Sequence, residues 1–535
     1  MFKTKEKSSL SLPVNREQAN HGLLITGLLV AMLFSALEGT IVGTAMPRIV
    51  GELGGLGVMT WLTTAYMLSS TAVVPIAGKL ADMLGRKSIY VTGLIVFMVG
   101  SALCGMATTM TQLIYYRALQ GIGGGIMMPM AMIVIGDIFT GAQRAKWQGV
   151  FGAIFGLASL IGPQVGGWIV DSANWRWVFY INLPVGILAT VLISIGLHNH
   201  RLEGPIRLDL GGMFTMIIGV VALLLALTFG GKDFAWDSWQ ILSLFVIAVV
   251  ALVAFVRIER KTAEPIFPMY LFQNRTFTML NGVAFLMSIG MFGAITFIPF
   301  FMQGIIGMTP SQSGTMMLPM MVSMMIASVL GGRLVRSIGV RSQIILGMAL
   351  MSAGFYLLST MTMETTMLVA MSFLAVLGLG LGFVMPVITL ALQESFPKEQ
   401  LGVVTSSSQF FRQIGGTFGM TVLGAIMNHQ SSVLLVDQLI PYLENLPPQA
   451  HDMVDTFEDM VTHNPQGLYS MLLSPEALAQ IPQEIRSSLL PILQSTLVTA
   501  LHSVFLYGLL FVGLGILLAF FVGKVTISDK PAEEQ

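Results

Sequence analysis

A single acidic residue stands inside the first apolar segment of the chain. Residues 22–47 form an apolar run in which Glu38 is the only charged side chain. At about 1.5 Å per helical residue this run is about 36 Å long and exceeds the roughly 30 Å of a membrane's hydrocarbon core. A carboxylate deep in a bilayer costs about 2.5–3.5 kcal/mol on insertion scales, so it usually has a partner or a function. Glu38 is therefore either a proton-carrying group or a buried acid that only fixes helix packing.

Arg117 is the natural partner of Glu38. It lies in the apolar segment 110–136, which should cross the membrane in the opposite direction and place Arg117 at a similar depth. A nearby base favours the ionised form of a carboxyl and burial favours its protonated form, so a small rearrangement is enough to change its protonation near neutral pH. The pair predicts proton coupling in the N-terminal part of the chain, with a purely structural salt bridge as the alternative.

The composition indicates an all-α integral membrane protein. Charged residues make up 10% of the chain and hydrophobic residues 54%, and the mean hydropathy is +0.79. Apolar runs of about 20 residues, enough for one helical span, recur from end to end. The zero net charge gives no indication of a nucleic-acid partner. We expect no enzyme activity, metal site or cofactor, because no metal cluster, nucleophile elbow or nucleotide loop occurs.

Fourteen apolar segments are long enough to span a membrane. An even number of spans puts both termini on one side, and most of the 27 Lys and Arg residues fall on that side. The positive-inside rule identifies it as the cytoplasm. The spans lie near 22–46, 58–78, 88–108, 110–136, 147–170, 176–197, 210–230, 239–257, 278–302, 312–332, 342–361, 364–390, 403–428 and 494–523.

The chain contains an internal repeat. Residues 78–87 and 332–341 share the spacing of Gly, base, Leu, Gly and base, and residues 121–129 resemble 378–386. Both pairs are eight spans apart rather than six, so two extra spans separate the halves. The predicted division is a cytoplasmic tail (1–21), a six-helix bundle (22–197), a linker (198–277) with extra spans near 210–230 and 239–257, a second six-helix bundle (278–523) with a long extracellular loop (429–493), and a cytoplasmic tail (524–535).

Five motifs in order give the chain a family resemblance. They occupy residues 37–47, 78–87, 117–121, 162–167 and 175–184. With these motifs the chain resembles the fourteen-span drug:proton antiporters of the major facilitator superfamily over nearly its whole length. The resemblance implies a major facilitator fold, with two six-helix bundles and two additional helices. The sequence departs from the family pattern at Glu38, where relatives usually have Asp, and at Arg336, whose counterpart in the first loop is Asp82.

The loop 78–87 is a candidate gate. Gly78 and Gly85 permit a tight reversal, and the basic residues hold it at the cytoplasmic face. The resemblance implies that Asp82 contacts the N-terminal end of helix 13 near residues 405–406. It also implies that Arg86 meets Asp137 at the inner end of helix 4. The alternative is a turn whose charges only set the topology.

The motif in predicted helix 5 is the one that the resemblance assigns to antiporters. Gly162, Gly166 and Gly167 leave one face of the helix smooth, and Pro163 introduces a kink. Small residues allow close helix packing in lipid, and a membrane proline is tolerated where neighbours satisfy the freed carbonyl. Close packing alone also explains the glycines.

Several side chains are candidates for a central cavity, namely Tyr66, Gln164, Phe292 and Arg412. Arg412 either lines the cavity or extends its charge toward the membrane surface. The methionines and phenylalanines within 291–301 either form an adaptable drug pocket or face lipid and core. The acidic segment near 428–492 belongs outside the cell, either as a tolerated insertion or as a gate or partner-binding element.

These observations predict a proton-coupled antiporter of the bacterial cytoplasmic membrane. It would export hydrophobic and cationic compounds by alternating access between two bundles, driven by the proton gradient. Its expected partners are small substrates, protons and membrane lipid, and we expect a monomer. The alternatives are an exporter dedicated to one endogenous metabolite, peptide or lipid, and a non-transporting membrane sensor.

Overall fold

The computed structural model describes residues 15–54, 58–198, 208–231, 233–308, 312, 315–443, 461, 468–469 and 483–527. Within these ranges the chain is helical, and the isolated bridge between Gly230 and Phe234 is the only β-pairing. Most of the predicted loop 429–493 and most of the predicted tails 1–21 and 524–535 lie outside the described residues. The side chain of Pro163 lies outside them as well.

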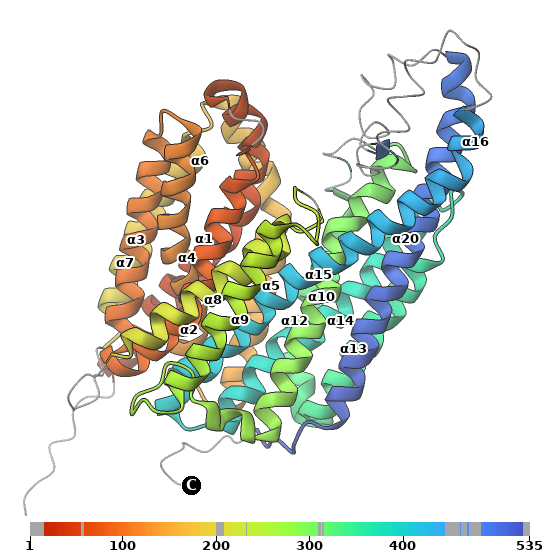
Figure 1. Ribbon diagram of the computed structural model, residues 1–535. Helices are drawn as coiled ribbons and strands as arrows, with labels where there is room; N and C mark the ends of the chain where they lie inside the picture. Colours follow the sequence, from red (N-terminus) through yellow and green to blue (C-terminus); the bar gives the residue numbers. More distant parts are fainter. Residues whose placement is uncertain are drawn as a thin grey trace, which may run out of the picture.

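The N-terminal half is built from long apolar helices with short connections. Gly85 has a φ of 93° and joins α2 directly to α3, a backbone conformation that glycine adopts without a steric penalty. We call the end of the molecule that carries this turn the Gly85 end; it is the lower end in Figure 1. The helices are α1 (Asn15–Leu53), α2 (Trp61–Leu84), α3 (Arg86–Met106), α4 (Met110–Ile138), α5 (Gly141–Ser172), α6 (Trp177–Tyr180) and α7 (Asn182–Gly196).

Two helices, α8 (Leu210–Phe229) and α9 (Trp239–Glu259), follow this half and form a hairpin. The C-terminal half then repeats the long-helix pattern, and α20 ends at the Gly85 end, where α1 begins (Figure 1). Its elements are η2 (Met269–Gln273), α10 (Arg275–Gly304), α12 (Leu318–Ile338), α13 (Val340–Ser359), α14 (Met367–Ser395), η3 (Lys398–Gln400), α15 (Leu401–Gln438), α16 (Ile440–Leu443) and α20 (Gln483–Phe520).

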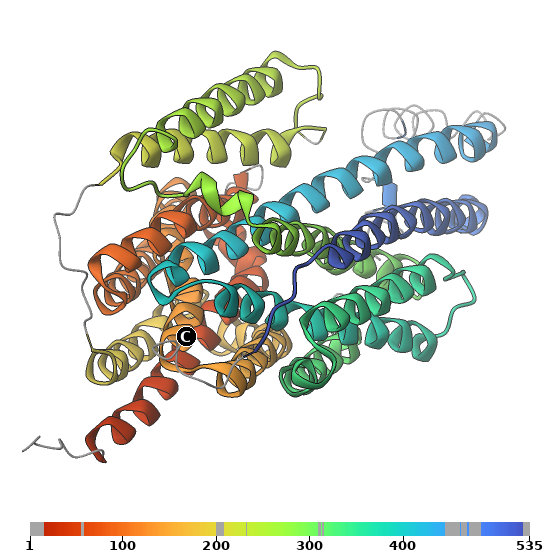
Figure 2. The same cartoon turned by 90° about the horizontal axis from the view of Figure 1, so that it is seen from below.

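The same packing pattern occurs in both halves. In the first half α4 packs on α2 and α3, and α1 packs on α5 and α7; in the second half α14 packs on α12 and α13, and α10 packs on α15 and α20. The halves meet mainly through two reciprocal contacts, of α2 with α15 and of α5 with α12, and less extensively through α5 with α14 and α4 with α15. Figures 1 and 2 show the two groups of helices side by side. The internal repeat of the sequence therefore has a counterpart in helix packing.

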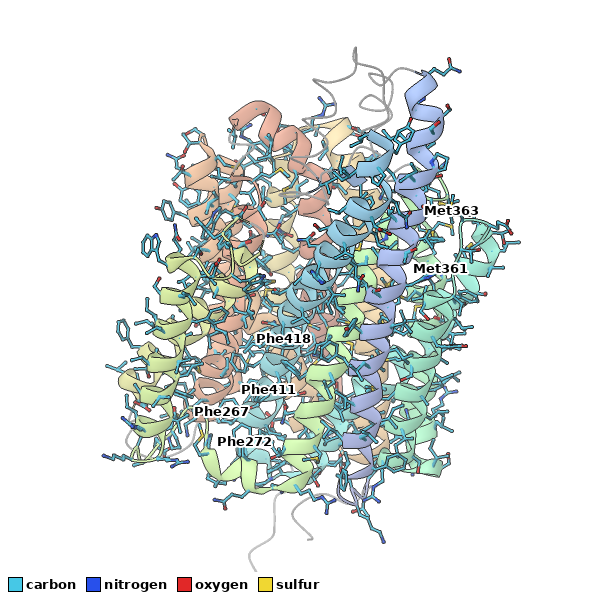
Figure 3. All side chains as sticks on the ribbon, turned by 45° about the vertical axis from the view of Figure 1, so that its right-hand side comes forward. Phe267, Phe272, Met361, Met363, Phe411 and Phe418 are labelled. Atoms are coloured by element: carbon cyan, nitrogen blue, oxygen red, sulfur yellow. The ribbon has the colours of Figure 1, made fainter. Side chains whose placement is uncertain are left out.

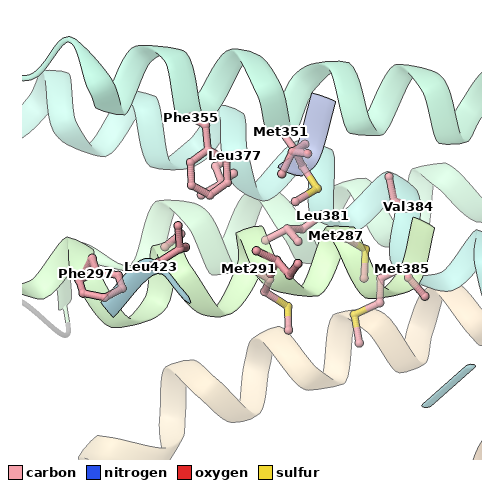
Figure 4. Close-up of a cluster of buried hydrophobic side chains, with 14 of the residues drawn as sticks. Met287, Met291, Phe297, Met351, Phe355, Leu377, Leu381, Val384, Met385 and Leu423 are labelled. Carbon is pink, nitrogen blue, oxygen red and sulfur yellow. The ribbon is translucent and has the colours of Figure 1, made fainter. Parts of the chain in front are cut away.

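The N-terminal half has apolar clusters of its own, and the cluster of the C-terminal half also includes residues of α2, α5 and α8. The C-terminal core contains Met287, Met291, Phe297, Met351 and Phe355, all of them buried (Figure 4). The methionines and phenylalanines within 291–301 were expected either to form a drug pocket or to face lipid and core. Met291 and Phe297 are buried in the core. Methionine and phenylalanine fill this space because all sides of these helices face other helices or lipid.

The α8–α9 hairpin lies at the side of the molecule where the two halves meet (Figure 2). Its helices pack mainly on each other, and α8 also contacts α2 and α15. The rings of Trp61 and Phe229 are 5.0 Å apart, and Thr421 donates a hydrogen bond of 2.7 Å to the carbonyl of Leu227. The hairpin thus touches one interface helix from each half.

An aromatic cluster attaches the segment after α9 to the C-terminal half (Figure 3). Phe267 stacks on Phe272 with a ring separation of 5.5 Å. Both rings lie 6.2 Å from Phe411 of α15, in edge-to-face geometry. Such pairs add to the free energy of area burial, so the connection from α9 to α10 is held against α15.

Twelve of the described helical segments are long and apolar enough to cross a membrane, with α6 and α7 counted together. Neither α5 nor α15 is among these twelve. The comparatively polar sequence of α15, which carries residues 405–409 and Arg412, explains why hydropathy alone does not select it. The count of fourteen spans and the cytoplasmic side of the termini therefore stay predictions.

Candidate functional site

Glu38 and Arg117 form a buried ion pair between α1 and α4. The Nη1 group of Arg117 donates to Glu38 Oε1 at 2.5 Å, and the two side chains are 2% and 1% exposed. Gln120 Nε2 donates to the same oxygen at 3.0 Å. Asn182 Nδ2, on α7, donates to Glu38 Oε2 at 2.7 Å. Both carboxylate oxygens are therefore satisfied without water.

Several groups fix the plane of the Arg117 guanidinium. Its Nε donates to the carbonyl of Leu62 at 3.1 Å, and Nη1 also donates to Gln120 Oε1 at 2.7 Å. The Tyr66 ring lies 4.4 Å from Cζ and the Phe179 ring 5.9 Å, which allows cation–π attraction. These contacts come from α2, α4 and α6, so the position of Arg117 depends on the packing of the N-terminal half.

Ser101 on α3 connects the polar groups around Glu38. Its hydroxyl accepts from Asn182 Nδ2 at 2.9 Å and from Gln120 Nε2 at 3.2 Å, and it donates to the carbonyl of Phe179 at 2.8 Å. Sequence analysis did not assign Ser101, Gln120 or Asn182 to the site. Gln120 and Asn182 lie inside two of the motifs, which is a signal that could have found them, whereas Ser101 has no such signal.

The ion pair leaves no uncompensated charge of Glu38 or Arg117 in the interior of the N-terminal half. With Glu38 ionised, the pair with Arg117 is neutral and each partner lowers the cost of burying the other. Protonation of Glu38 would leave Arg117 with the acceptors of Leu62 and Gln120 only. The ion pair is therefore a principal polar contact between α1 and α4.

In the motif at residues 175–184, Asn182 contacts Glu38, whereas Trp175 and Arg176 contact the end of α1. Trp175 Nε1 donates to Glu52 Oε2 at 2.6 Å, and Arg176 Nη1 donates to Glu52 Oε1 at 2.5 Å. Glu52 lies beyond the apolar span of α1, and the hydrogen bond from Arg176 lowers the pKa of its carboxyl below the ordinary value. These bonds hold the end of α1 that is opposite the Gly85 end.

Asp82 connects the two halves at the Gly85 end. Its carboxylate accepts hydrogen bonds of 3.0 Å from the backbone N–H groups of Gly402 and Val403, the first turn of α15. Anions are favoured there by the unpaired N–H groups and the helix dipole. The contact is on the expected helix but a turn before 405–406. Ser406 instead faces Gly78, where an added Cβ would lie 2.1 Å from its hydroxyl oxygen.

Arg86 adds further polar contacts next to Asp82. Its Nη2 lies 2.9 Å from Asp82 Oδ1 and its Nε donates to Asp137 Oδ2 at 2.7 Å. Nη2 also donates to the carbonyl of Lys398 in the other half at 3.0 Å. The structure thus brings Asp82, Arg86 and Asp137 together next to the turn at Gly85.

A second polar connection between the halves was missed by sequence analysis. Arg144 of α5 pairs with Glu394 of α14 at 2.8 Å and donates to the carbonyl of Gln393 at 3.0 Å. Gln393 in turn donates to the carbonyl of Met132 at 2.9 Å and accepts from Gln148 at 3.0 Å. The internal repeat gave a signal, since its spacing places Glu394 at the position equivalent to Asp137.

The glycines of the predicted antiporter motif differ in their surroundings. A Cβ on Gly162 would lie 1.9 Å from Thr40 Oγ1, and one on Gly166 would lie 2.2 Å from Thr44 Oγ1. These two glycines therefore allow α5 to lie directly against α1, within two turns of Glu38. A Cβ on Gly167 would meet nothing within 4 Å.

The candidates for a central cavity do not form one group. Tyr66 lies under Arg117 in the Glu38 site, and Gln164 is exposed on α5. Phe292 packs on α15, where a Cβ added to Gly416 would lie 2.5 Å from its ring. Arg412 is buried on the same helix, at 5% exposure.

Comparison with known proteins agrees with this architecture. The family model of the Major Facilitator Superfamily matches residues 28–420, more than half of the chain. The chain is 64% identical over 519 residues to the multidrug transporter protein MdtP of Bacillus subtilis, which covers 97% of this chain and 96% of MdtP. It is 39% identical over 414 residues to multidrug resistance protein 3 of the same bacterium, which covers 77% and 81% of the two chains.

Solved structures of two transporters are similar in fold. The human organic anion transporter MFSD10 aligns with a TM-score of 0.59 at 13% identity and covers 94% of this chain and 100% of its own. The proton:xylose symporter XylE also gives 0.59, at 11% identity, with 95% and 97% covered. The proteins of this family are transporters, not enzymes, and the bacterial relative and the many spans identify a multi-pass protein of the cytoplasmic membrane. The chain belongs to the Major Facilitator Superfamily.

Proposed function

We propose that this protein is a proton-coupled antiporter that exports hydrophobic compounds, cationic ones included, across the bacterial cytoplasmic membrane. The observation that carries the proposal is the buried pair of Glu38 and Arg117, with its complete set of hydrogen-bond partners. The names of two relatives, a multidrug transporter and a multidrug resistance protein, support a broad substrate range. The proton gradient drives the exchange, and no cofactor takes part.

The proposed topology has fourteen spans. We count α5 and α15 as spans in addition to the twelve apolar helical segments, because they pack on α1 and α10 within the two halves. The Gly85 end is the cytoplasmic end, because the basic residues of most connections lie there. The functional unit is a monomer of two bundles, 22–197 and 278–523, with the α8–α9 linker at its side.

The proposed mechanism is alternating access, and the structure corresponds to a state closed at the cytoplasmic end. The polar contacts of Asp82, Arg86 and Arg144 with the C-terminal half lie at that end. Turnover requires these contacts to break while the halves close at the opposite end. Asp82 and Arg144 are buried in this closed state, and both gain contact with water when the end opens, which offsets part of the cost of losing these contacts.

Proton and substrate compete for the same state of the carrier. Protonation of Glu38 from outside weakens the α1–α4 contact and favours the inward-open state, and proton release inside restores the ion pair. When the exported compound is neutral, moving one proton down a membrane potential of 100 mV supplies about 2.3 kcal/mol, before any pH gradient is counted. When it is a monovalent cation, the two charge movements cancel and the pH gradient drives a one-for-one exchange. This free energy supports a useful concentration ratio of the exported compound.

The test is Glu38→Gln in inverted membrane vesicles energised by a proton gradient. Glutamine keeps the volume and most hydrogen bonds but does not titrate. We expect gradient-driven accumulation of a cationic dye to be abolished while the protein is still inserted at normal abundance. Glu364→Gln, an exposed glutamate in a connecting loop, is the matched control and should transport at the wild-type rate.

The same vesicles test the substrate range. Accumulation of several unrelated dyes and antiseptics supports a multidrug antiporter. Accumulation of one endogenous metabolite, peptide or lipid alone would replace it with a dedicated exporter. If Glu38→Gln exports the dye at the wild-type rate with undiminished proton release, the proposed role of Glu38 is wrong.

A further inference from the structure

Arg412 differs from the other deeply buried arginines. Arg117 and Arg144 pair with Glu38 and Glu394, but none of the described carboxylates lies within ion-pair distance of Arg412. The side chain is nevertheless 5% exposed, in the middle part of α15. Among the described residues its one hydrogen bond runs to Oε1 of Gln409, one turn earlier.

Only one N–H donor of Arg412 meets an acceptor among the described residues. A guanidinium carries five N–H donors and cannot lose its charge in a protein. Gln409 accepts one of these donors and directs its own Nε2 to the sulfur of Met128 at 3.4 Å, a weak acceptor. A buried charge without a counter-charge is costly, so this arrangement fits a group that awaits an anionic partner.

Arg412 lies where the two halves face each other. Gln409 contacts Met128 of α4, and Thr417, further along α15, lies 3.9 Å from the sulfur of Met67 of α2. The closing contacts of Asp82 are at Gly402, ten residues earlier and therefore about 15 Å nearer the Gly85 end. Arg412 is thus above the closed gate, between helices that must separate during alternating access.

The charge balance of this region favours an anion. The carboxylate of Glu38 is neutralised by Arg117. The buried carboxylates of Asp209 and Glu259, which have no ion pair among the described residues, lie at the ends of α8 and α9, so they do not neutralise Arg412 where the two halves face each other. Its field is weakly screened in a low-dielectric interior.

Met128 and Met67 lie on the facing helices of the other half, and Phe292 of α10 packs against Gly416, one turn beyond Arg412. All three offer apolar contact in this region.

We propose that Arg412 binds the anionic group of amphiphilic substrates, a carboxylate or sulfonate, and that anionic amphiphiles belong to the transported range. The planar guanidinium suits two parallel hydrogen bonds to such a group, while the apolar neighbours accept the body of the molecule. This inference rests on the proposed export function and extends it from cationic compounds to anionic ones. It identifies Arg412 as the residue that selects them.

The test uses two fluorescent probes that differ mainly in one sulfonate. The anionic probe is 1-anilinonaphthalene-8-sulfonate and the neutral probe is N-phenyl-1-naphthylamine. Their binding is measured on the whole protein in lipid nanodiscs, with empty nanodiscs as background. We expect Arg412→Gln to weaken binding of the anionic probe about tenfold or more, a loss of about 1.4 kcal/mol, and to leave the neutral probe within about twofold. Arg412→Lys should retain part of the anion affinity, because it keeps the charge but not the planar fork.

Arg260→Gln is the control, since it removes an exposed arginine just after α9. It should leave the affinity of both probes unchanged. Equal weakening of both probes by Arg412→Gln would show a packing role and overturn the proposal. Unchanged binding of the anionic probe would overturn it as well.

A transport measurement separates this inference from the proposed function. Energised vesicles should accumulate the anionic probe in a gradient-dependent way that Arg412→Gln reduces about tenfold or more relative to the neutral probe. Such uptake identifies the transported molecule, rather than a lipid headgroup, as the ligand. If a cationic dye is accumulated and the anionic probe is neither bound nor accumulated, the inference fails and the export function stands. If no compound is accumulated at all, the export function itself fails.

Discussion

At the scale of single residues, the buried pair of Glu38 and Arg117 is costly to break. Removing one partner of a buried ion pair typically costs about 3–5 kcal/mol, because the other charge is left without compensation. The bonds from Gln120 and Asn182 reduce this cost for the carboxylate but cannot replace a cation. In the proposed mechanism, protonation of Glu38 compensates the carboxylate while its ion pair with Arg117 is broken.

Glu38→Asp should keep part of the activity. The carboxylate survives but is shorter by one methylene, so it cannot keep all its bonds to Arg117 and Asn182 at 2.5 and 2.7 Å. We expect a slower, still gradient-driven efflux, measured as the initial rate in energised vesicles. A rate as low as that of Glu38→Gln would mean that the exact position of the carboxylate matters as much as its ability to bind a proton.

At the scale of elements, the contact of α1 with α5 explains why glycine occupies two positions of the helix 5 motif. The hydroxyls of Thr40 and Thr44 fill the space that side chains on Gly162 and Gly166 would need. Because Glu38 lies on the same helix as these threonines, a shift of α1 would also move the carboxylate. The contact that requires glycine on α5 therefore also fixes the position of the helix that carries Glu38.

Gly162→Ala should destabilise the protein, because its Cβ would lie 1.9 Å from Thr40 Oγ1 and push the helices apart. Overpacking of this kind costs about 1–3 kcal/mol, to be measured as a lowered thermal midpoint of the purified protein, together with a reduced transport rate. Gly167→Ala is the matched control, since its Cβ meets open space. Equal effects of the two substitutions would contradict the packing explanation.

At the scale of the whole molecule, two bundles of similar packing are closed at one end by a small set of polar contacts. Asp82 holds the first turn of α15, and Arg144 holds the end of α14. Each contact joins a residue of one half to backbone or side chain of the other, so the contacts act on the relative position of the bundles. In the proposed alternating-access mechanism, their strength sets the balance between the two end states.

Asp82→Asn should weaken the closed state at the Gly85 end. The amide keeps one acceptor for the N–H groups of Gly402 and Val403 but loses the charge that interacts with Arg86 and with the helix terminus. We expect transport to fall while membrane abundance and drug binding stay near wild type. Spin labels on exposed positions of both halves should report a longer distance at this end.

Asp233→Asn, an exposed change in the α8–α9 hairpin, is the control for this prediction and should alter neither transport nor distance. Full transport and an unchanged label distance in Asp82→Asn would reduce the loop 78–87 to a signal for topology.

The sequence by itself determined the class of protein and the principal pair. Apolar runs longer than a bilayer leave a membrane-spanning helix as the available structure, because backbone groups in lipid must pair within the segment. Glu38 and Arg117 could be paired from the sequence because their spans cross the membrane in opposite directions. The position of each residue within its span then gives its depth in the membrane, and the two depths agree. The repeat of 78–87 in 332–341 likewise indicated two similar halves, as the packing of α2 with α4 and of α12 with α14 shows.

Only the tertiary structure decided which polar groups meet. Helices that are apolar on all sides carry no pattern that fixes their rotation. The sequence therefore could not place Ser101 at Glu38, and its only signal for Asn182 was the position of that residue inside a motif. The same limit hid the pairing of Arg144 with Glu394 across the two halves. It also left the surroundings of Arg412 open, because the absence of a carboxylate beside a charge follows from the three-dimensional packing of several helices, not from spacing along one of them.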